Sequence, residues 1–227
     1  MRKVVHVAVI VVLLGLFGLN NAFAIHGKEH PKKKAILLVA FGTSVPEAQK
    51  VYEKIDEKVR QAFSGEEVRW GYTSDIIRSK LAKEGKSIDS PELALAKLME
   101  ENYTHVAVLS LHTIPGAEFH DLNRNAKLYG QMAGGFERIL VAWPLLSSHE
   151  DMVKVAERII KHLPAERKPE EVVLLMGHGT EHHPADAVYA AMNQVFQGMD
   201  SNVLVATVEG YPALNDLLPQ IEKSGAQ

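Results

Sequence analysis

Short apolar runs alternate with amphipathic segments from residue 35 to the end of the chain. The apolar runs predict β-strands because they are brief and apolar throughout, which is typical of strands that are covered on both faces of a sheet. The predicted strands are 35–41, 68–72, 106–111, 139–142, 172–176 and 203–208.

The amphipathic segments predict helices. In 46–63, for example, Val51, Ile55, Val59 and Ala62 recur at helical spacing with charged residues between them. Several of these segments open with a proline in the first turn, as helices commonly do. The alternation of the two patterns predicts an α/β fold with parallel sheets. The predicted helices are 46–63, 76–83, 91–101, 118–131, 149–162, 184–196 and 212–222.

One internal similarity predicts two related halves. Residues 37–44 read LLVAFGTS and residues 174–181 read LLMGHGTE, with four identities in eight positions. Each stretch is a buried strand that ends in Gly-Thr at the start of a β-α series, so we expect two Rossmann-like halves, at 35–143 and 144–227. A second half as long as the first would extend well beyond Gln227. We therefore expect an incomplete second half, either because the sequence is a fragment or because its terminus is divergent.

The first 24 residues have the layout of a secretory signal peptide. Arg2 and Lys3 precede an apolar run at 4–17, and Ala22-Phe23-Ala24 places small residues at the two positions that a signal peptidase reads. The run is shorter than the 20 or so residues of a spanning helix. We expect cleavage before Ile25, a polar leader at 25–34, a periplasmic protein and no membrane partner after cleavage.

Composition narrows the function. Residues 25–227 contain 23 basic and 28 acidic residues, a mildly acidic balance without a long basic block, which argues against nucleic-acid binding. The chain has no cysteine, so disulfides and thiolate metal sites are excluded, and histidine and carboxylate remain as ligands for a transition metal. Neither a phosphate-binding loop nor a dinucleotide-binding glycine motif follows a strand, which argues against a nucleotide-binding protein.

Candidate chemistry lies where the predicted strands end, because ligands of open α/β sheets bind at the carboxyl ends of strands. His112, His149, His178 and Glu209 follow such strands and are predicted to face one cleft. His178 has glycines on both sides, which allow a tight turn and the close approach of a ligand. An imidazole there can bind a metal or accept a proton. Each histidine has a structural alternative, and Glu209 can instead stabilise the start of the following helix.

Five segments resemble the anaerobic sirohydrochlorin cobaltochelatases, a branch of the class II tetrapyrrole chelatases. With its predicted signal peptide, the chain resembles the periplasmic form of this family. The five segments are TSDIIRSKL at 73–81, SLHTIPGAE at 110–118, PLLSSHED at 144–151, MGHGTEHH at 176–183 and VEGYP at 208–212. The resemblance implies a ferrochelatase-like fold and insertion of Co²⁺ into sirohydrochlorin. It also implies that His178 is a metal ligand and base with Glu209 as its carboxylate partner. The second histidine of the family, in a GDHAxND-like stretch, is absent from these 227 residues.

Substrate carboxylates would need hydroxyl or cationic partners. Each candidate for this role can equally be an ordinary solvated surface residue. Our candidates are Ser44, Arg78, Lys80, Ser147 and Ser148. His182 and His183 are candidates for the cleft wall next to His178, before a helix that opens at Pro184.

Three alternatives stay open. The physiological metal can also be iron or nickel, because the same nitrogen and oxygen ligands bind all three divalent metals. An exported chelatase scaffold can also serve as a periplasmic haem or metal carrier, with His120 as an axial haem ligand that subunits of a homo-oligomer can share. A plain surface histidine is the other interpretation of His120.

Overall fold

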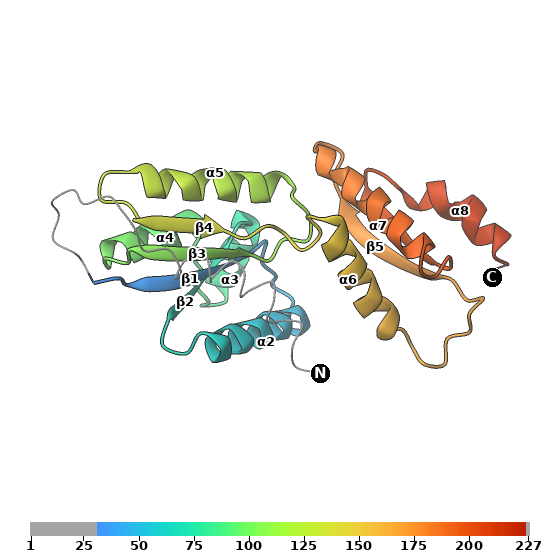
Figure 1. The fold of residues 1–227 in the computed structure, drawn as a ribbon, viewed down its shortest axis with the longest axis horizontal. Helices are drawn as coiled ribbons and strands as arrows, with labels where there is room; N and C mark the ends of the chain where they lie inside the picture. Colours follow the sequence, from blue (N-terminus) through green and yellow to red (C-terminus); the bar gives the residue numbers. More distant parts are fainter. Residues whose placement is uncertain (1–30, 226–227) are drawn as a thin grey trace. The chain divides into compact units, whose positions relative to one another are not determined.

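The computed structural model of the protein describes residues 31–225, so the predicted signal peptide and most of the polar leader lie outside the described residues. The chain divides into two compact units (Figure 1). The first runs through His112 and also contains Glu118–Trp143; the second contains Thr113–Ala117 and the residues from Pro144 onward. None of the described helices is long and apolar enough to cross a membrane.

A four-stranded parallel sheet forms the centre of the first unit, in the order β2-β1-β3-β4. Its strands are β1 (Lys34–Ala40), β2 (Glu67–Tyr72), β3 (His105–Ser110) and β4 (Arg138–Val141). Four helices belong to this unit: α2 (Pro46–Ala62), α3 (Asp75–Lys83), α4 (Pro91–Glu100) and α5 (Ala117–Gln131).

Both faces of this sheet are covered, as the apolar runs predict. Leu37 and Val39 of β1 pack on one face with residues of α4 and α5, whereas Ile36 and Leu38 pack on the other with Val59 of α2. Successive strand residues point to opposite faces, so one apolar strand contributes side chains to the cores on both faces of the sheet. Each such buried side chain stabilises the fold by about 1.5–3 kcal/mol.

The second unit contains a two-stranded parallel sheet, β5 (Val173–Gly179) and β6 (Val203–Glu209). Val203 and Val205 pack with residues of α6 (His149–Lys161) and α7 (Ala187–Gln197). Leu204 and Ala206 face the other way and pack with Leu217 of α8 (Leu214–Lys223). A short 3-10 helix, η1 (Pro184–Asp186), precedes α7.

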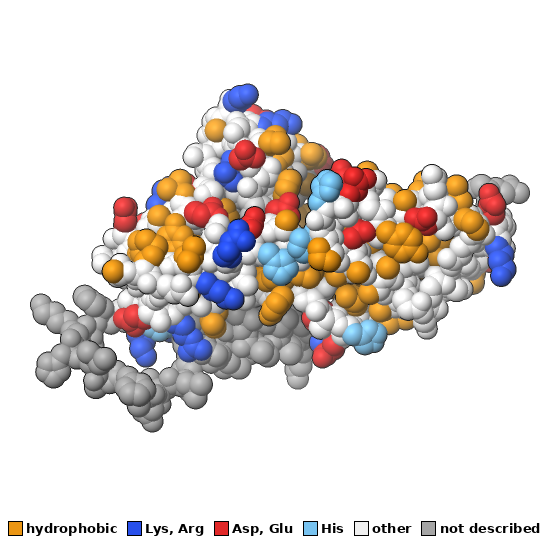
Figure 2. All heavy atoms as spheres, turned by 90° about the horizontal axis from the view of Figure 1, so that it is seen from above, with side chains coloured by type: hydrophobic (Ala, Val, Ile, Leu, Met, Phe, Trp, Pro, Cys, Tyr) orange, Lys and Arg blue, Asp and Glu red, His pale blue; other side chains and the backbone are white. Residues whose placement is uncertain are grey.

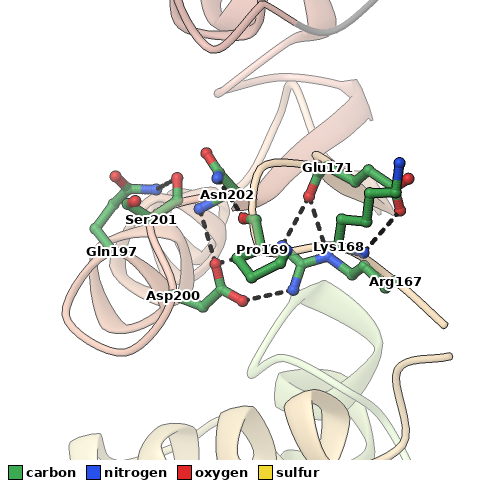
Figure 3. A network of polar contacts seen from close by, with 8 residues as sticks. All are labelled: Arg167, Lys168, Pro169, Glu171, Gln197, Asp200, Ser201 and Asn202. Atoms are coloured by element: carbon green, nitrogen blue, oxygen red, sulfur yellow. Dashed lines mark hydrogen bonds and ion pairs between the residues drawn. The ribbon is translucent and has the colours of Figure 1, made fainter. Parts of the chain in front are cut away.

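A polar network fixes the amino ends of β5 and β6 (Figure 3). Arg167 forms an ion pair with Asp200 (Nη1 to Oδ2, 2.7 Å), and Asn202 Nδ2 donates to the Pro169 carbonyl at 2.8 Å. The Asn202 carbonyl in turn accepts from Val173, the first residue of β5. This end of the unit is therefore occupied by structural contacts, which leaves the carboxyl ends of the strands for function.

The predicted elements all exist, with shifted ends. β5 extends to Gly179 rather than ending at Met176, because its last residues pair with Thr207 and Glu209 of β6. The predicted helix at 184–196 begins with η1, and the predicted helix at 212–222 begins at Leu214. Pro212 is held outside that helix because its carbonyl accepts from Thr207 N at 2.7 Å and Thr207 Oγ1 at 3.0 Å.

Candidate active site

His178 and Glu209 lie on neighbouring strands at the carboxyl edge of the second unit. Gly179 of β5 is paired with Glu209 of β6, so His178 is one position away from that pair. Strand spacing of about 4.8 Å and a rise of about 3.3 Å per residue place the two backbones within about 6 Å of each other. Both side chains are exposed.

Gly179 and Gly210 end the regular ladder directly after these two residues. Both adopt left-handed backbone conformations, with φ of 79° and 84°. In a continued ladder, His178 and Glu209 would point to opposite faces of the sheet, because His178 stands level with Val208. Both residues are exposed and stand at the rim of the sheet, directly before the glycine at which each strand turns away.

The glycines beside His178 are required by close packing. A methyl group at Gly177 would lie 2.3 Å from the Tyr189 ring, and one at Gly179 would lie 1.6 Å from the Glu209 carbonyl oxygen. Burial raises the pKa of Tyr189, whose hydroxyl also interacts with the Gly179 backbone. His178 is therefore carried on a rigid backbone that rests on Tyr189 and on β6.

Asp186 joins the two loops that follow β5 and β6, and the sequence analysis missed it. Its carboxylate accepts from the backbone N–H of Thr180 (3.3 Å) and from that of Tyr211. Gly210 gives it room, because a side chain there would meet the Asp186 carboxylate at 2.6 Å. In sequence Asp186 resembles an ordinary acidic residue in a first helical turn, and its reach to Tyr211 depends on the fold.

Most of the other predicted substrate-binding side chains have internal partners. Arg78 Nη1 donates to the carbonyls of Tyr72 and Thr73, the latter at 2.9 Å. Ser147 Oγ donates to the Pro144 carbonyl at 2.6 Å. Ser148 is the N-cap of α6: its Oγ accepts from Asp151 N at 3.1 Å and donates to Asp151 Oδ2 at 2.6 Å.

The histidines after His178 differ in their contacts. His183 Nδ1 accepts from Ala185 N at 3.1 Å and thereby caps η1, and the His182 backbone N–H donates to Thr180 Oγ1 at 3.3 Å. The His182 side chain is exposed, as are those of Lys80, His120 and His149, and Ser44 is half-buried. Across residues 31–225, no group of three or more histidine and acidic side chains is arranged to hold a metal ion.

The carboxyl edge of the first unit holds a second polar cluster, in which Thr73 follows β2 and His112 follows β3. His112 Nδ1 lies 2.9 Å from Ser110 Oγ. Burial lowers the pKa of His112, although the neighbouring Glu118 carboxylate acts in the opposite direction. His112 is therefore a neutral imidazole at neutral pH, and it belongs to a different unit from His149 and His178.

Comparison with known proteins places the chain in a family. Residues 34–227 match the family described as Cobalt chelatase (CbiK). The chain belongs to this family. The predicted resemblance to the anaerobic cobaltochelatases is thereby confirmed.

Two relatives resemble this CbiK-family chain over most of its length. It is 42% identical over 195 residues to the sirohydrochlorin cobaltochelatase CbiKC of Nitratidesulfovibrio vulgaris, covering 86% of this chain and 68% of that protein. It is 34% identical over 195 residues to the sirohydrochlorin cobaltochelatase of Salmonella typhimurium, covering 85% and 72%.

Solved structures confirm the fold class predicted for this CbiK-family chain. SirB from Bacillus subtilis with Fe³⁺ superposes with a TM-score of 0.55 at 20% identity, over 84% of this chain and 71% of that one. The sirohydrochlorin chelatase SirB from Bacillus subtilis subspecies spizizenii, in complex with cobalt, gives 0.54 at 18% identity, over 85% and 81%. The α/β chelatase fold with parallel sheets is shared.

Proposed function

We propose that this chain is a sirohydrochlorin cobaltochelatase that inserts Co²⁺ into the macrocycle at the carboxyl ends of β5 and β6. Two relatives that it matches at 42% and 34% identity carry that name. The observation that carries the proposal is the position of His178, exposed between two glycines and one position from the residue paired with Glu209.

The chemistry requires a metal held loosely enough to be passed on. A neutral imidazole nitrogen of His178 and a carboxylate oxygen of Glu209 are a borderline and a hard ligand, a combination that suits a divalent first-row metal such as Co²⁺. Two protein ligands leave coordination positions for water, which pyrrole nitrogens then replace. The rigid backbone at Gly177 and Gly179 keeps the imidazole in place during that exchange.

Insertion also releases protons. Two N–H bonds of sirohydrochlorin break as its four ring nitrogens bind Co²⁺, so the reaction yields cobalt-sirohydrochlorin and two protons. His178 or Glu209, once released from the metal, can accept such a proton, and a well-placed general base contributes about 10²–10⁴-fold in rate.

The surface around His178 suits the flat, apolar face of a tetrapyrrole ring. Met176, on the same strand face as His178, is 51% exposed, and Val208 on the neighbouring strand is 69% exposed. Apolar side chains lie open among charged ones on the surface in Figure 2. These two side chains can contact the ring while the imidazole reaches its nitrogens.

Turnover separates a chelatase from a carrier. Purified protein is mixed with excess sirohydrochlorin and Co²⁺, and the absorption spectrum of the product is followed. We expect many equivalents of cobalt-sirohydrochlorin per protein. One equivalent or less, held on the protein, would instead identify a binding protein. Parallel reactions with Fe²⁺ and Ni²⁺ rank the metals by kcat/KM, and Co²⁺ is expected to rank first.

A haem-binding role is a second candidate, based on α5 and the strand that follows it. His120 is exposed and its ring stacks edge-on with Phe119 at 5.6 Å, while Phe119 also contacts Trp143, which is 65% exposed. An exposed imidazole can bind haem axially, and aromatic side chains near it can cover part of the haem ring. We expect a Soret band after incubation with haem, lost in His120→Ala and kept in His162→Ala.

Export is the remaining part of the proposal. In a Gram-negative host we expect the protein in the periplasmic fraction with Ile25 as its first residue. Amino-terminal sequencing of the purified protein tests this, and a chain that retains Met1 would contradict it.

A further inference from the structure

Two tyrosines extend the internal similarity of the two units. Tyr52 of α2 and Tyr189 of α7 are 137 positions apart, the same separation as Leu37 and Leu174 at the start of the repeated motif. Each tyrosine follows a valine and lies in the first α-helix after the strand that carries the motif. The two side chains therefore occupy equivalent places in the two units.

Each tyrosine contacts the left-handed glycine that ends the motif of its own unit. Burial raises the pKa of Tyr189, and the Gly179 backbone acts on it in the opposite direction. Burial also raises the pKa of Tyr52, again against the effect of a glycine backbone, that of Gly42. A hydrogen bond that favours the ionised phenol comes from a donor, so in both units the glycine N–H donates to the tyrosine oxygen. The same contact thus holds the turn after each motif strand.

In the second unit the tyrosine makes a further contact, on the other side of His178. A methyl group at Gly177 would lie 2.3 Å from the nearest atom of the Tyr189 ring and 2.8 Å from the next. The first unit has Ala40 at the equivalent position, 1% exposed, so there the same space holds a methyl group. The Tyr189 phenol therefore contacts the backbone both before and after His178.

The phenol supports the strand from the face opposite to the imidazole. Tyr189 is 8% exposed and belongs to the apolar core between β5 and the helices α6 and α7. Leu175 packs against that core, and Gly177 shares its strand face because side chains alternate along a strand. His178 is one position further, so its side chain is directed away from the core and is exposed. A fixed, buried group thus holds the backbone of an exposed one.

We propose that Tyr189 is a positioning residue for His178: its phenol holds the backbone on both sides of the imidazole and so fixes where the imidazole meets the metal. The inference rests on the proposed function, because it takes His178 as the metal ligand. Misplacing a reacting group by about 1 Å can cost about 10²-fold in rate, so a rigid support matters for the chemistry. Tyr52 holds the equivalent turn behind Phe41, a residue with no proposed role in the reaction.

The first test is Tyr189→Phe in steady-state insertion of Co²⁺. The variant keeps the ring that packs on Gly177 and loses only the oxygen that holds Gly179. We expect kcat to fall about tenfold, with KM for sirohydrochlorin within about twofold of wild type, because the macrocycle keeps its contacts while the metal ligand is less well placed. An unchanged kcat would overturn the inference.

Tyr52→Phe is the matched control, since it removes the same hydrogen bond from the equivalent turn of the first unit. We expect its midpoint of thermal unfolding to fall about as far as that of Tyr189→Phe, with kcat within about twofold of wild type. A role in stability alone predicts that both variants lose activity equally, and that result would overturn the inference.

A double variant shows whether Tyr189 acts through His178. In the His178→Ala background the imidazole is gone, so adding Tyr189→Phe should leave kcat within about twofold of that of His178→Ala alone. A further tenfold loss would mean that Tyr189 acts independently of His178, which contradicts a positioning role.

Titration with Co²⁺ alone separates this inference from the proposed function. Isothermal calorimetry should give a Kd for Co²⁺ that is about tenfold higher in Tyr189→Phe than in wild type and unchanged in Tyr52→Phe. Equal Kd values in Tyr189→Phe and wild type, or no binding of Co²⁺ by wild type, would overturn the positioning role. Binding of Co²⁺ with the expected Kd values but without turnover would overturn the proposed function alone.

Discussion

Gly42 after β1 and Gly179 at the end of β5 occupy the same position in the repeated Leu-Leu…Gly-Thr motif, and both are left-handed, with φ of 101° and 79°. In each unit the missing side chain faces the neighbouring strand: the Tyr72 ring at 2.5 Å in the first, the Glu209 carbonyl at 1.6 Å in the second. The residue just before each glycine differs, Phe41 in one and His178 in the other. The two units thus share a backbone turn and differ in the side chain that it presents.

The largest expected effect comes from that one difference. His178→Ala should lower kcat/KM for cobalt insertion by about 10²–10⁴-fold, because it removes the proposed metal ligand and general base. Phe41 is 50% exposed at the equivalent position, and Phe41→Ala should change kcat/KM by less than about fivefold. Steady-state insertion assays on both variants measure this ratio. Similar losses in both would show that the turn acts through shape alone.

The next largest effect is expected from adding a methyl group at the two tightly packed glycines. Gly179→Ala places a methyl group on the fixed backbone of β6, so we expect at least about 3 kcal/mol of destabilisation and a large loss of activity. Gly42→Ala meets a side-chain ring that can shift, and we expect about 1–3 kcal/mol. Thermal unfolding followed by circular dichroism measures both.

Gly85 is the control for these glycines, because it has the same φ of 79° as Gly179 and no atom within 4 Å of the missing side chain. Gly85→Ala should therefore report the cost of the left-handed backbone alone, about 1–2 kcal/mol. A loss in Gly179→Ala no greater than that of Gly85→Ala would contradict the close packing of β5 on β6.

The repeated motif also marks where sequence reasoning succeeds. Continuous apolar runs identified all six strands, since buried parallel strands are apolar on both faces. His178 could be proposed as a site residue because its glycines are next to it in sequence. Asp186 and the length of β5 were missed because each depends on a partner that is distant in sequence, Tyr211 and Glu209, respectively. The late start of α8 was missed because it depends on the contact of Thr207 with the Pro212 carbonyl, which no sequence pattern indicates.

We expect a substitution at Asp186 to have an intermediate effect on stability and activity. The repeated motif of the first unit has no equivalent carboxylate. Asp186→Asn keeps the size of the side chain but places an amide N–H₂ against one of two backbone donors, Thr180 N or Tyr211 N. We expect about 1–3 kcal/mol of destabilisation and about tenfold lower kcat, because both loops that carry the proposed ligands loosen.

Asp216 is the matched control for Asp186, because its carboxylate also accepts from a backbone N–H, that of Ala213 at 2.8 Å, but ties together only the first turn of α8. Asp216→Asn should cost about 1 kcal/mol and leave kcat within about twofold. A normal kcat for Asp186→Asn at a temperature where the variant is fully folded would show that Asp186 does not contribute to the site.

The smallest effect separates a helix cap from a substrate contact. Ser74 caps α3 in the first unit by accepting from Ile77 N at 3.3 Å, and Ser148 caps α6 in the second by accepting from Asp151 N at 3.1 Å. Ser74→Ala and Ser148→Ala should each cost about 1 kcal/mol of stability. Because the Ser148 hydroxyl also donates its proton to Asp151, it has none left for a substrate carboxylate, so KM for sirohydrochlorin should stay within about twofold of wild type. A rise in KM for Ser148→Ala alone, without a greater loss of stability than Ser74→Ala, would mean that this hydroxyl leaves Asp151 when the macrocycle binds.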